Sequence, residues 1–265
     1  MKLFCRKYGT GPPLVILHGL YGSSDNWVTI ARKISGSFTV YLPDQRNHGL
    51  SPHSSDHNYD VLSLDLLELV DDLGLGSFIL TGHSMGGKVA VSFALRWPER
   101  INSLIVIDIS PFRGSQIDDQ PYRLHQEILN TILSINPGKS ETRADVEKLV
   151  AERISDERIR GFILKNLQRS DKGFLRWKLD AGSLLRNLDK IMQEVLLPGN
   201  LSLPVTGFPV TFIKGEDSQY LPISDLKDIQ KVFSAAELIN VRNAGHWIHA
   251  DRPDVIEEIL IQQLK

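Results

Sequence analysis

The chain has 265 residues, of which 42% are hydrophobic and 23% are charged, and its formal net charge is −2 at pH 7. That length predicts one large core with an inserted lobe, or a single α/β barrel, rather than two full domains. A charge balance so close to neutral provides no basic surface for nucleic acid, so we expect no nucleic-acid partner.

The start of the chain and its cysteine content favour a cytoplasmic location. In the opening residues MKLFCRKYG, Arg6 and Lys7 interrupt the apolar run, so a secretory signal is not expected. Cys5 is the only cysteine, which excludes an intramolecular disulfide and suits a reducing compartment. No stretch approaches the roughly 18 apolar residues of a membrane helix. We therefore expect a cytoplasmic protein without membrane insertion.

The first half of the chain alternates short apolar runs with helical spacing. The runs that read as buried strands are 13–19, 38–44, 77–82 and 103–110, and the helical patterns are 26–34, 60–73 and 85–97. Strands that are apolar at nearly every position are typical of parallel sheets covered on both faces. The alternation predicts βαβ units in an open, mostly parallel sheet.

The pattern changes in the second half of the chain. Between about Pro121 and Leu197 the sequence predicts charged helices and no strand. Strand signals return at 208–217 and 236–245, and a helix closes the chain. We predict an α/β core formed by residues 1–111 and 207–265, interrupted by a helical cap over residues 112–206.

The stretch FILTGHSMGGKVA holds a serine between two glycines, where a predicted strand meets a predicted helix. Gly-x-Ser-x-Gly in that context is typical of a nucleophile elbow, a strained turn that exposes the hydroxyl above the carboxyl edge of the sheet. Gly82 and Gly86 let strand and helix pass closely without Cβ clashes. The alternative is a glycine-rich turn with an incidental serine, which the flanking elements disfavour. Ser84 is therefore the candidate nucleophile.

A serine nucleophile needs a base, and the chain has eight histidines. His246 is placed best, because it follows the last predicted strand in a loop at the same edge of the sheet. His249, three residues later, reads as a local structural residue, and the pair without a third ligand does not predict a metal site. The side chain of His83, next to Ser84, is expected to point away from the tip of the elbow.

The acid that orients the base has two candidates. Asp217 follows the strand before the last, in KGEDSQYL, and Asp108 ends the strand after the nucleophile helix, in VIDISP. Both would emerge at the carboxyl edge of the sheet. The sequence favours Asp217 and leaves Asp108 open.

The loop after the first core strand predicts the rest of the oxyanion hole. In HGLYGSSDNW the backbone N–H of Leu20 is expected to pair with that of Met85, which starts the nucleophile helix. The nearby loop PDQRNHGLS carries Asp44 and His48, which we interpret as hydrogen-bonded loop architecture. Contact of His48 with substrate is the alternative.

Taken together, the motifs HGLYGSSDNW, DQRNHGLS, GHSMGGKVA, VIDISP, KGEDS and GHWIH resemble the α/β-hydrolase superfamily, and more narrowly its small intracellular esterases with a short helical cap. The resemblance runs from about Leu14 to the C-terminus. It implies the α/β-hydrolase fold and the roles of Ser84 as nucleophile, His246 as base, and Leu20 and Met85 as oxyanion donors. It does not choose between the two acids.

The function predicted is that of a serine carboxylesterase acting on short- to medium-chain acyl esters, thioesters included, without cofactor or metal. Carbon–carbon bond hydrolysis, menaquinone-pathway elimination and perhydrolysis by the same triad are the alternative reactions. A non-catalytic binding protein is the alternative from another class.

Trp247 reads equally as a substrate contact or as packing under the cap. The basic stretch 158–178 reads as a solvated face, with recognition of an anionic acyl carrier as the alternative. We expect a monomer or weak homodimer.

Overall fold

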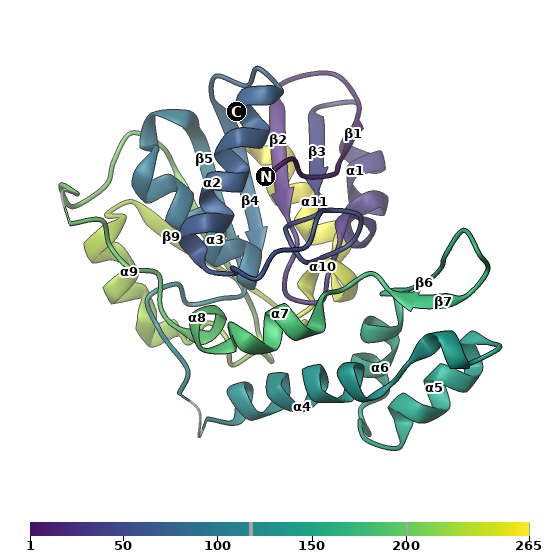
Figure 1. The fold of residues 1–265 in the computed structure, drawn as a ribbon. Coiled ribbons are helices and arrows are strands. Elements are labelled where there is room, and N and C mark those ends of the chain that lie inside the picture. Colours follow the sequence, from purple (N-terminus) through teal and green to yellow (C-terminus); the bar gives the residue numbers. More distant parts are fainter. Residues whose placement is uncertain (117–118, 200, 265) are drawn as a thin grey trace.

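A computed structural model describes residues 1–116, 119–199 and 201–264. Its centre is a seven-stranded sheet (Figure 1). The order across the sheet is β1 (Cys5–Tyr8), β3 (Thr39–Pro43), β2 (Pro13–Leu17), β4 (Phe78–His83), β5 (Ile101–Ile107), β8 (Val210–Gly215) and β9 (Ala236–Val241). β1 pairs antiparallel with β3, and the other neighbouring strands pair in parallel. The predicted mostly parallel sheet is therefore confirmed, and β1 is an edge strand that the sequence did not indicate.

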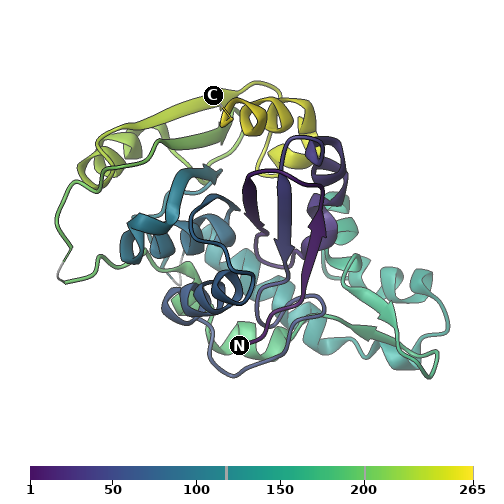
Figure 2. The same cartoon turned by 90° about the horizontal axis from the view of Figure 1, so that it is seen from above.

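Helices cover both faces of the sheet (Figure 2). Helices α2 (Tyr59–Asp72) and α3 (Met85–Arg96) pack on one face, and α1 (Val28–Ile34) and α11 (Pro253–Gln262) pack on the other. Successive side chains of β2 alternate between these layers: Val15 and Leu17 join the cluster with α2 and α3, whereas Leu14 and Ile16 join the cluster with α1 and α11. Burial on both faces explains why the strands are apolar at nearly every position.

Shorter elements complete the core. Helix α9 (Leu226–Val232) links β8 to β9, and α10 (Ile248–Asp251) precedes α11. Short 3-10 turns cover Ser24–Trp27, Pro98–Arg100, Pro137–Lys139 and Ile223–Asp225. Among the residues described, no helix has the length and apolar character needed to cross a bilayer.

The elements between β5 and β8 gather beyond the carboxyl ends of the parallel strands (Figure 1). They are α4 (Gln120–Ser134), α5 (Arg143–Ala151), α6 (Glu157–Leu164), β6 (Leu167–Arg169), β7 (Leu175–Trp177), α7 (Ala181–Arg186) and α8 (Leu188–Met192), and we call them the cap elements. They occupy the place predicted for the cap. Its exact limits, residues 112–206, stay a prediction.

The expectation that this region holds no strand was wrong. β6 and β7 form an antiparallel hairpin in which Leu167 pairs with Trp177. Three residues per strand are too few to show a two-residue period, and only Leu167 and Leu175 are buried while Arg169 and Arg176 are exposed. Gly173, with a φ of 84°, makes the turn.

Polar side chains tie the cap elements to loops of the core. The amide of Asn166 donates to the carbonyl of Tyr21 at 2.8 Å, and that of Asn187 donates to the carbonyl of Ser55 at 2.7 Å. In the other direction, the Tyr59 hydroxyl donates to the carbonyl of Ile191 at 2.5 Å. Each bond joins a side-chain donor on one side of this interface to a backbone carbonyl on the other.

The close packing between β4 and α3 predicts a large difference between two glycine substitutions. A Cβ on Gly86 would lie 2.6 Å from the carbonyl oxygen of Leu17 and 2.5 Å from that of His18. We expect Gly86→Ala to reduce the free energy of unfolding by roughly 1–3 kcal/mol, because backbone must move. Gly161, inside α6, has no atom within 4 Å of its Cβ position. We expect Gly161→Ala to stabilise by about 0.5–1 kcal/mol. Urea denaturation of both variants checks the contrast, and equal effects would contradict it.

Candidate active site

The turn between β4 and α3 holds Ser84 in a left-handed backbone conformation, with φ 54° and ψ −122°. A non-glycine residue in this region is strained and persists only where its surroundings impose it. Here the constraint comes from the flanking glycines. A Cβ on Gly82 would lie 2.1 Å from the carbonyl oxygen of Gly86, so the two ends of the turn are in direct contact. The predicted elbow geometry is present.

The hydroxyl of Ser84 faces the loop that follows β9. Its Oγ lies 3.1 Å from Nε2 of His246, and Nδ1 of that ring lies 2.7 Å from Oδ2 of Asp108. An ionised carboxylate can only accept, so the ring proton belongs on Nδ1. That tautomer leaves the Nε2 lone pair free to take the serine proton. The three side chains, brought together from three loops at one sheet edge, form a connected line from acid to hydroxyl.

The acid in this line is Asp108 and not Asp217, which the sequence favoured. Asp108 directly follows β5 and is fully buried. Its carboxylate also accepts from the backbone N–H of Gly215 at 2.9 Å and from the hydroxyl of Ser218. The backbone N–H of Asp217 donates to the carbonyl of Ala244, and its side chain is exposed to solvent. The turn after β8 therefore presents backbone and serine donors to Asp108 and points its own aspartate outward.

Two aromatic side chains fix His246, and sequence reasoning identified neither. Nε2 of His83 lies 2.8 Å from the backbone carbonyl of His246, so the ring donates there. The side chain that was expected to point away from the tip of the elbow thus contacts the loop of His246. The ring of Tyr220 stacks on that of His246, with centroids 3.9 Å apart and an interplanar angle of 23°. The position of His83 beside Ser84 was a usable signal, whereas Tyr220 lies in an irregular loop that offered none.

The two candidate oxyanion donors border the same space as Ser84. A Cβ on Gly19 would lie 3.2 Å from Cβ of Ser84, so the backbone leading into Leu20 passes directly beside that serine. Met85 is the first residue of α3, and its N–H therefore has no partner within the helix. For Leu20 too, no hydrogen-bond partner of the N–H is found among the described residues. Leu20 and Met85 both line the cavity at Ser84.

The neighbouring loops are braced by buried neutral histidines. Nδ1 of His18 donates to the carbonyl of Gly19 at 2.9 Å, while Nε2 accepts from the N–H of Gln45 at 3.0 Å. His48 repeats the arrangement, with Nδ1 on the carbonyl of Arg46 at 2.9 Å and Nε2 accepting from the N–H of Tyr21 at 3.3 Å. A ring that accepts at one nitrogen must be uncharged. Both residues therefore organise the loops through hydrogen bonds, and for His48 this is the interpretation that the sequence favoured.

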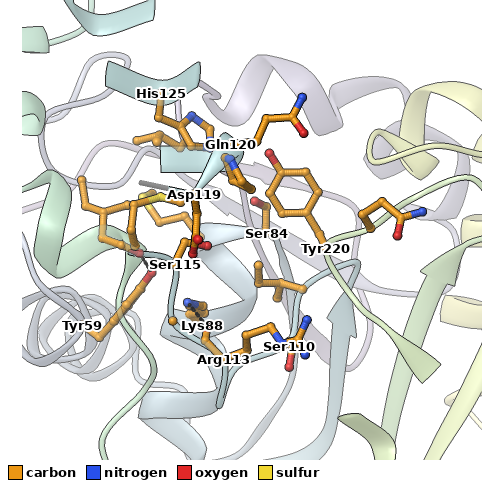
Figure 3. A pocket seen from close by; sticks show the side chains of 18 residues that line it. Tyr59, Ser84, Lys88, Ser110, Arg113, Ser115, Asp119, Gln120, His125 and Tyr220 are labelled. Carbon is orange, nitrogen blue, oxygen red and sulfur yellow. Dashed lines mark hydrogen bonds between the residues drawn. The ribbon is translucent and has the colours of Figure 1, made fainter. Parts of the chain in front are cut away.

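Two cavities meet at Ser84. The larger, of about 430 Å³, is lined by polar groups from α3, α4 and the segment after β5 (Figure 3). The smaller, of about 180 Å³, is lined by His246, Trp247 and apolar side chains of α4 and α6 such as Phe162. Trp247 both borders this cavity and packs on the cap, because its ring lies 5.4 Å from that of Phe162. The site therefore has two compartments of different polarity.

The basic stretch 158–178 contacts the protein itself at several points. Arg158 pairs with Asp251, and Lys178 pairs with Asp25 at 3.2 Å. Arg169 donates to the backbone carbonyl of Gly173 at 2.8 Å. In the described part of the chain, no group of three or more His, Cys, Asp or Glu side chains is arranged to hold a metal ion.

Comparison with known proteins gives the same architecture. Residues 12–253 match the family model described as alpha/beta hydrolase fold. The chain is 36% identical over 250 residues to the mouse sn-1-specific diacylglycerol lipase ABHD11, covering 92% of this chain and 78% of that protein. It is 30% identical over 244 residues to the esterase YbfF of Escherichia coli, covering 92% and 89%. A solved structure of a marine microorganism esterase superposes with a TM-score of 0.93 at 38% identity, over 98% of each chain.

This chain belongs to the α/β-hydrolase family. The family model spans all the strands of the sheet except β1, together with the elbow, the cap elements and the loop of His246. The resemblance seen in the motifs is thereby confirmed.

The buried histidines predict loss of stability in mild acid. Burial lowers the pKa of His57 and His249 to about 3 and that of His125 to about 4. It also lowers the pKa of His18, His48 and His83. In the unfolded chain these rings take up protons below about pH 6.5. The folded state excludes those protons, so each ring costs up to about 1.4 kcal/mol of stability per pH unit below that point.

We therefore expect Tm to fall steeply between pH 6.5 and 5, before the carboxyl groups of the unfolded chain titrate. Calorimetry across this window measures the change in Tm. In His125→Gln one fewer proton is taken up on unfolding, so the free energy of unfolding should fall less steeply with decreasing pH. A Tm that stays constant from pH 8 to 5 would contradict the assignment of neutral rings.

Proposed function

We propose that this protein is a serine carboxylesterase that forms an acyl-enzyme on Ser84. Its place as an ester-hydrolysing enzyme of the α/β-hydrolase family follows from the family model and from the relatives named esterase and lipase. The observation that carries the finer proposal is the hydrogen-bonded line from Asp108 through His246 to Ser84 in a strained elbow. A nucleophile, a base on it and a group orienting the base are the parts that acyl transfer requires.

The proposed reaction has two halves. His246 takes the proton of the Ser84 hydroxyl as its oxygen attacks the ester carbonyl carbon. The N–H groups of Leu20 and Met85 hold the negative oxygen that results. The carbon–oxygen bond to the alcohol then breaks, and His246 gives its proton to the leaving oxygen. Water, deprotonated in turn by His246, attacks the acyl-enzyme, and Ser84 leaves with the proton as the carboxylic acid is released.

Asp108 serves this cycle by stabilising the imidazolium that forms twice in each turnover. Three further features support its role: the carboxylate is fully buried, it accepts from two other donors, and its backbone is held at φ 52°. Such a carboxylate cannot rotate away from His246 without leaving buried donors unpaired. We assign Asp108 as the triad acid in place of Asp217.

The substrate that fits best is a small acyl ester. The smaller compartment, which His246 borders, holds about 180 Å³ and has mainly apolar walls, so the part of the ester on that side of Ser84 is short or of medium length. Trp247, from its place in that wall, would contact this part of the ester. The cytoplasmic location and the monomeric or weakly dimeric state stay predictions.

Substitution of the nucleophile tests the proposal directly. We expect Ser84→Ala to reduce kcat on p-nitrophenyl butyrate by at least about 10⁴-fold, because removing the nucleophile removes the covalent route. Labelling by a fluorophosphonate should disappear in the same variant, and circular dichroism controls for folding. Turnover near the wild-type rate in Ser84→Ala would overturn the proposal.

Matched substitutions of the two aspartates test the acid. We expect Asp108→Asn to lower kcat by about 10³–10⁴-fold, because an amide favours the wrong tautomer of His246. Asp217→Asn removes an exposed carboxylate and should leave kcat within about twofold. The reverse order of effects would assign the role to Asp217.

A further inference from the structure

The larger cavity contains a buried cation that the proposed triad does not use. Lys88 lies one turn along α3 from Ser84, and its backbone N–H donates to the Ser84 carbonyl at 3.1 Å. Its side chain is only 4% exposed and lines the cavity, between Tyr59 and Arg113 in Figure 3. Burying the charge of a lysine in a cavity wall costs free energy unless hydrogen bonds and charged partners compensate for the lost water. The groups that contact Nζ therefore show how far this charge is compensated.

A comparison with a second buried lysine shows that Lys88 is incompletely bonded. Nζ of Lys214 donates to three backbone carbonyls, at 2.6, 3.1 and 3.0 Å, and lines neither cavity. Nζ of Lys88 donates to two, those of Arg113 at 3.1 Å and Gln193 at 2.6 Å. An ammonium group has three N–H donors. The third donor of Lys88 has no protein acceptor among the described residues.

Among the described residues, no carboxylate lies within ion-pair distance of Lys88. The ring of Tyr59 lies 5.8 Å from Nζ. Burial lowers the pKa of Lys88 to about 8, and the charge of Glu194 opposes this effect. The group therefore remains mostly protonated at neutral pH. A buried cation without a carboxylate partner is stabilised by an anion that enters the cavity.

Other charged groups of this cavity lie in exposed positions. Arg113 is exposed and pairs with Asp225 at 3.2 Å. Asp119 is exposed too, and its carboxylate accepts from the N–H of Gln116 at 2.7 Å. At the exposed part of the wall the carboxylate of Asp119 would repel an anion. At the buried part the ammonium group of Lys88 would attract one.

The position of the base indicates which half of an ester enters this cavity. His246 lines the smaller cavity and not the larger one. In the proposed reaction it must protonate the leaving oxygen, so the alcohol lies on its side of Ser84. The acyl group is then directed the other way, along α3 toward Lys88.

We propose that the larger cavity binds acyl groups that end in a carboxylate, with Lys88 as the residue that recognises the anionic end. This inference rests on the proposed acyl-enzyme mechanism at Ser84. It assigns the enzyme to half-esters of dicarboxylic acids as a substrate class. A charged donor in a water-poor wall gives stronger recognition of a carboxylate than a surface lysine would.

Pairs of substrates that differ only in the end group test the inference on the wild-type enzyme. The probes are p-nitrophenyl half-esters of glutaric, adipic and suberic acids, each beside a neutral ester of equal length in which an isopropyl group replaces the carboxylate. We expect kcat/KM to favour the carboxylate by about tenfold or more at one chain length, mainly through KM. Equal or faster hydrolysis of the neutral ester at every length would overturn the inference and leave the esterase proposal standing. No turnover of either series would overturn both.

A variant pair assigns the preference to one side chain. We expect Lys88→Met, which keeps the length but loses the charge, to lower the carboxylate-to-neutral ratio of kcat/KM by about tenfold. Lys227→Met, at an exposed position of α9 outside both cavities, should keep the wild-type ratio. A preference that survives in Lys88→Met would show that another group reads the charge. The wild-type comparison remains decisive if Lys88→Met does not fold.

Discussion

The structure depends on one tight contact, the approach of β4 to α3 on either side of Ser84. With no side chain at Gly82 or Gly86, the backbone of the turn closes on itself and against the end of β2. That closure imposes the left-handed conformation of the serine and sets the direction in which α3 leaves the sheet. The direction of α3 then fixes two further groups on one helical face, the first N–H of the helix and the ammonium of Lys88 one turn later. A single backbone constraint thus places the proposed nucleophile, one proposed oxyanion donor and the buried cation.

Loops complete the site, and buried polar groups make them rigid. Asp44 shows how: its carboxylate accepts from the N–H of Ser24 at 2.6 Å and from that of Leu50 at 2.8 Å. Asp108 binds the turn after β8 in the same way, and neutral histidines brace the loop after β2. Each of these side chains satisfies backbone donors or acceptors that irregular structure would otherwise leave unpaired in the interior. A loop held at several points can present a catalytic group with a defined geometry.

The sequence predicted those parts of the molecule whose signals are local. Continuous apolar runs identified the six parallel strands because both sheet faces are covered, and the elbow was visible because its glycines and serine are adjacent. The choice between Asp108 and Asp217 depended on contacts between residues far apart in the sequence, which no local pattern reveals. Both follow a parallel strand, and what separates them is the turn of Ser218, which points its donors at one carboxylate and exposes the other. The short hairpin of the cap and the edge strand β1 escaped prediction because three or four residues carry too little periodicity.

The attachment of the cap to the core has a consequence for how the enzyme would treat a poorly fitting substrate. Asn166, between α6 and β6, holds the carbonyl of Tyr21, and Tyr21 directly follows the proposed oxyanion donor Leu20. A bulky group that displaces this part of the cap would therefore pull on the short loop that carries the proposed oxyanion donor. A substrate that fits the cap poorly would then be misaligned at its reacting carbonyl. The enzyme would therefore discriminate against it through a slower chemical step as well as through weaker binding.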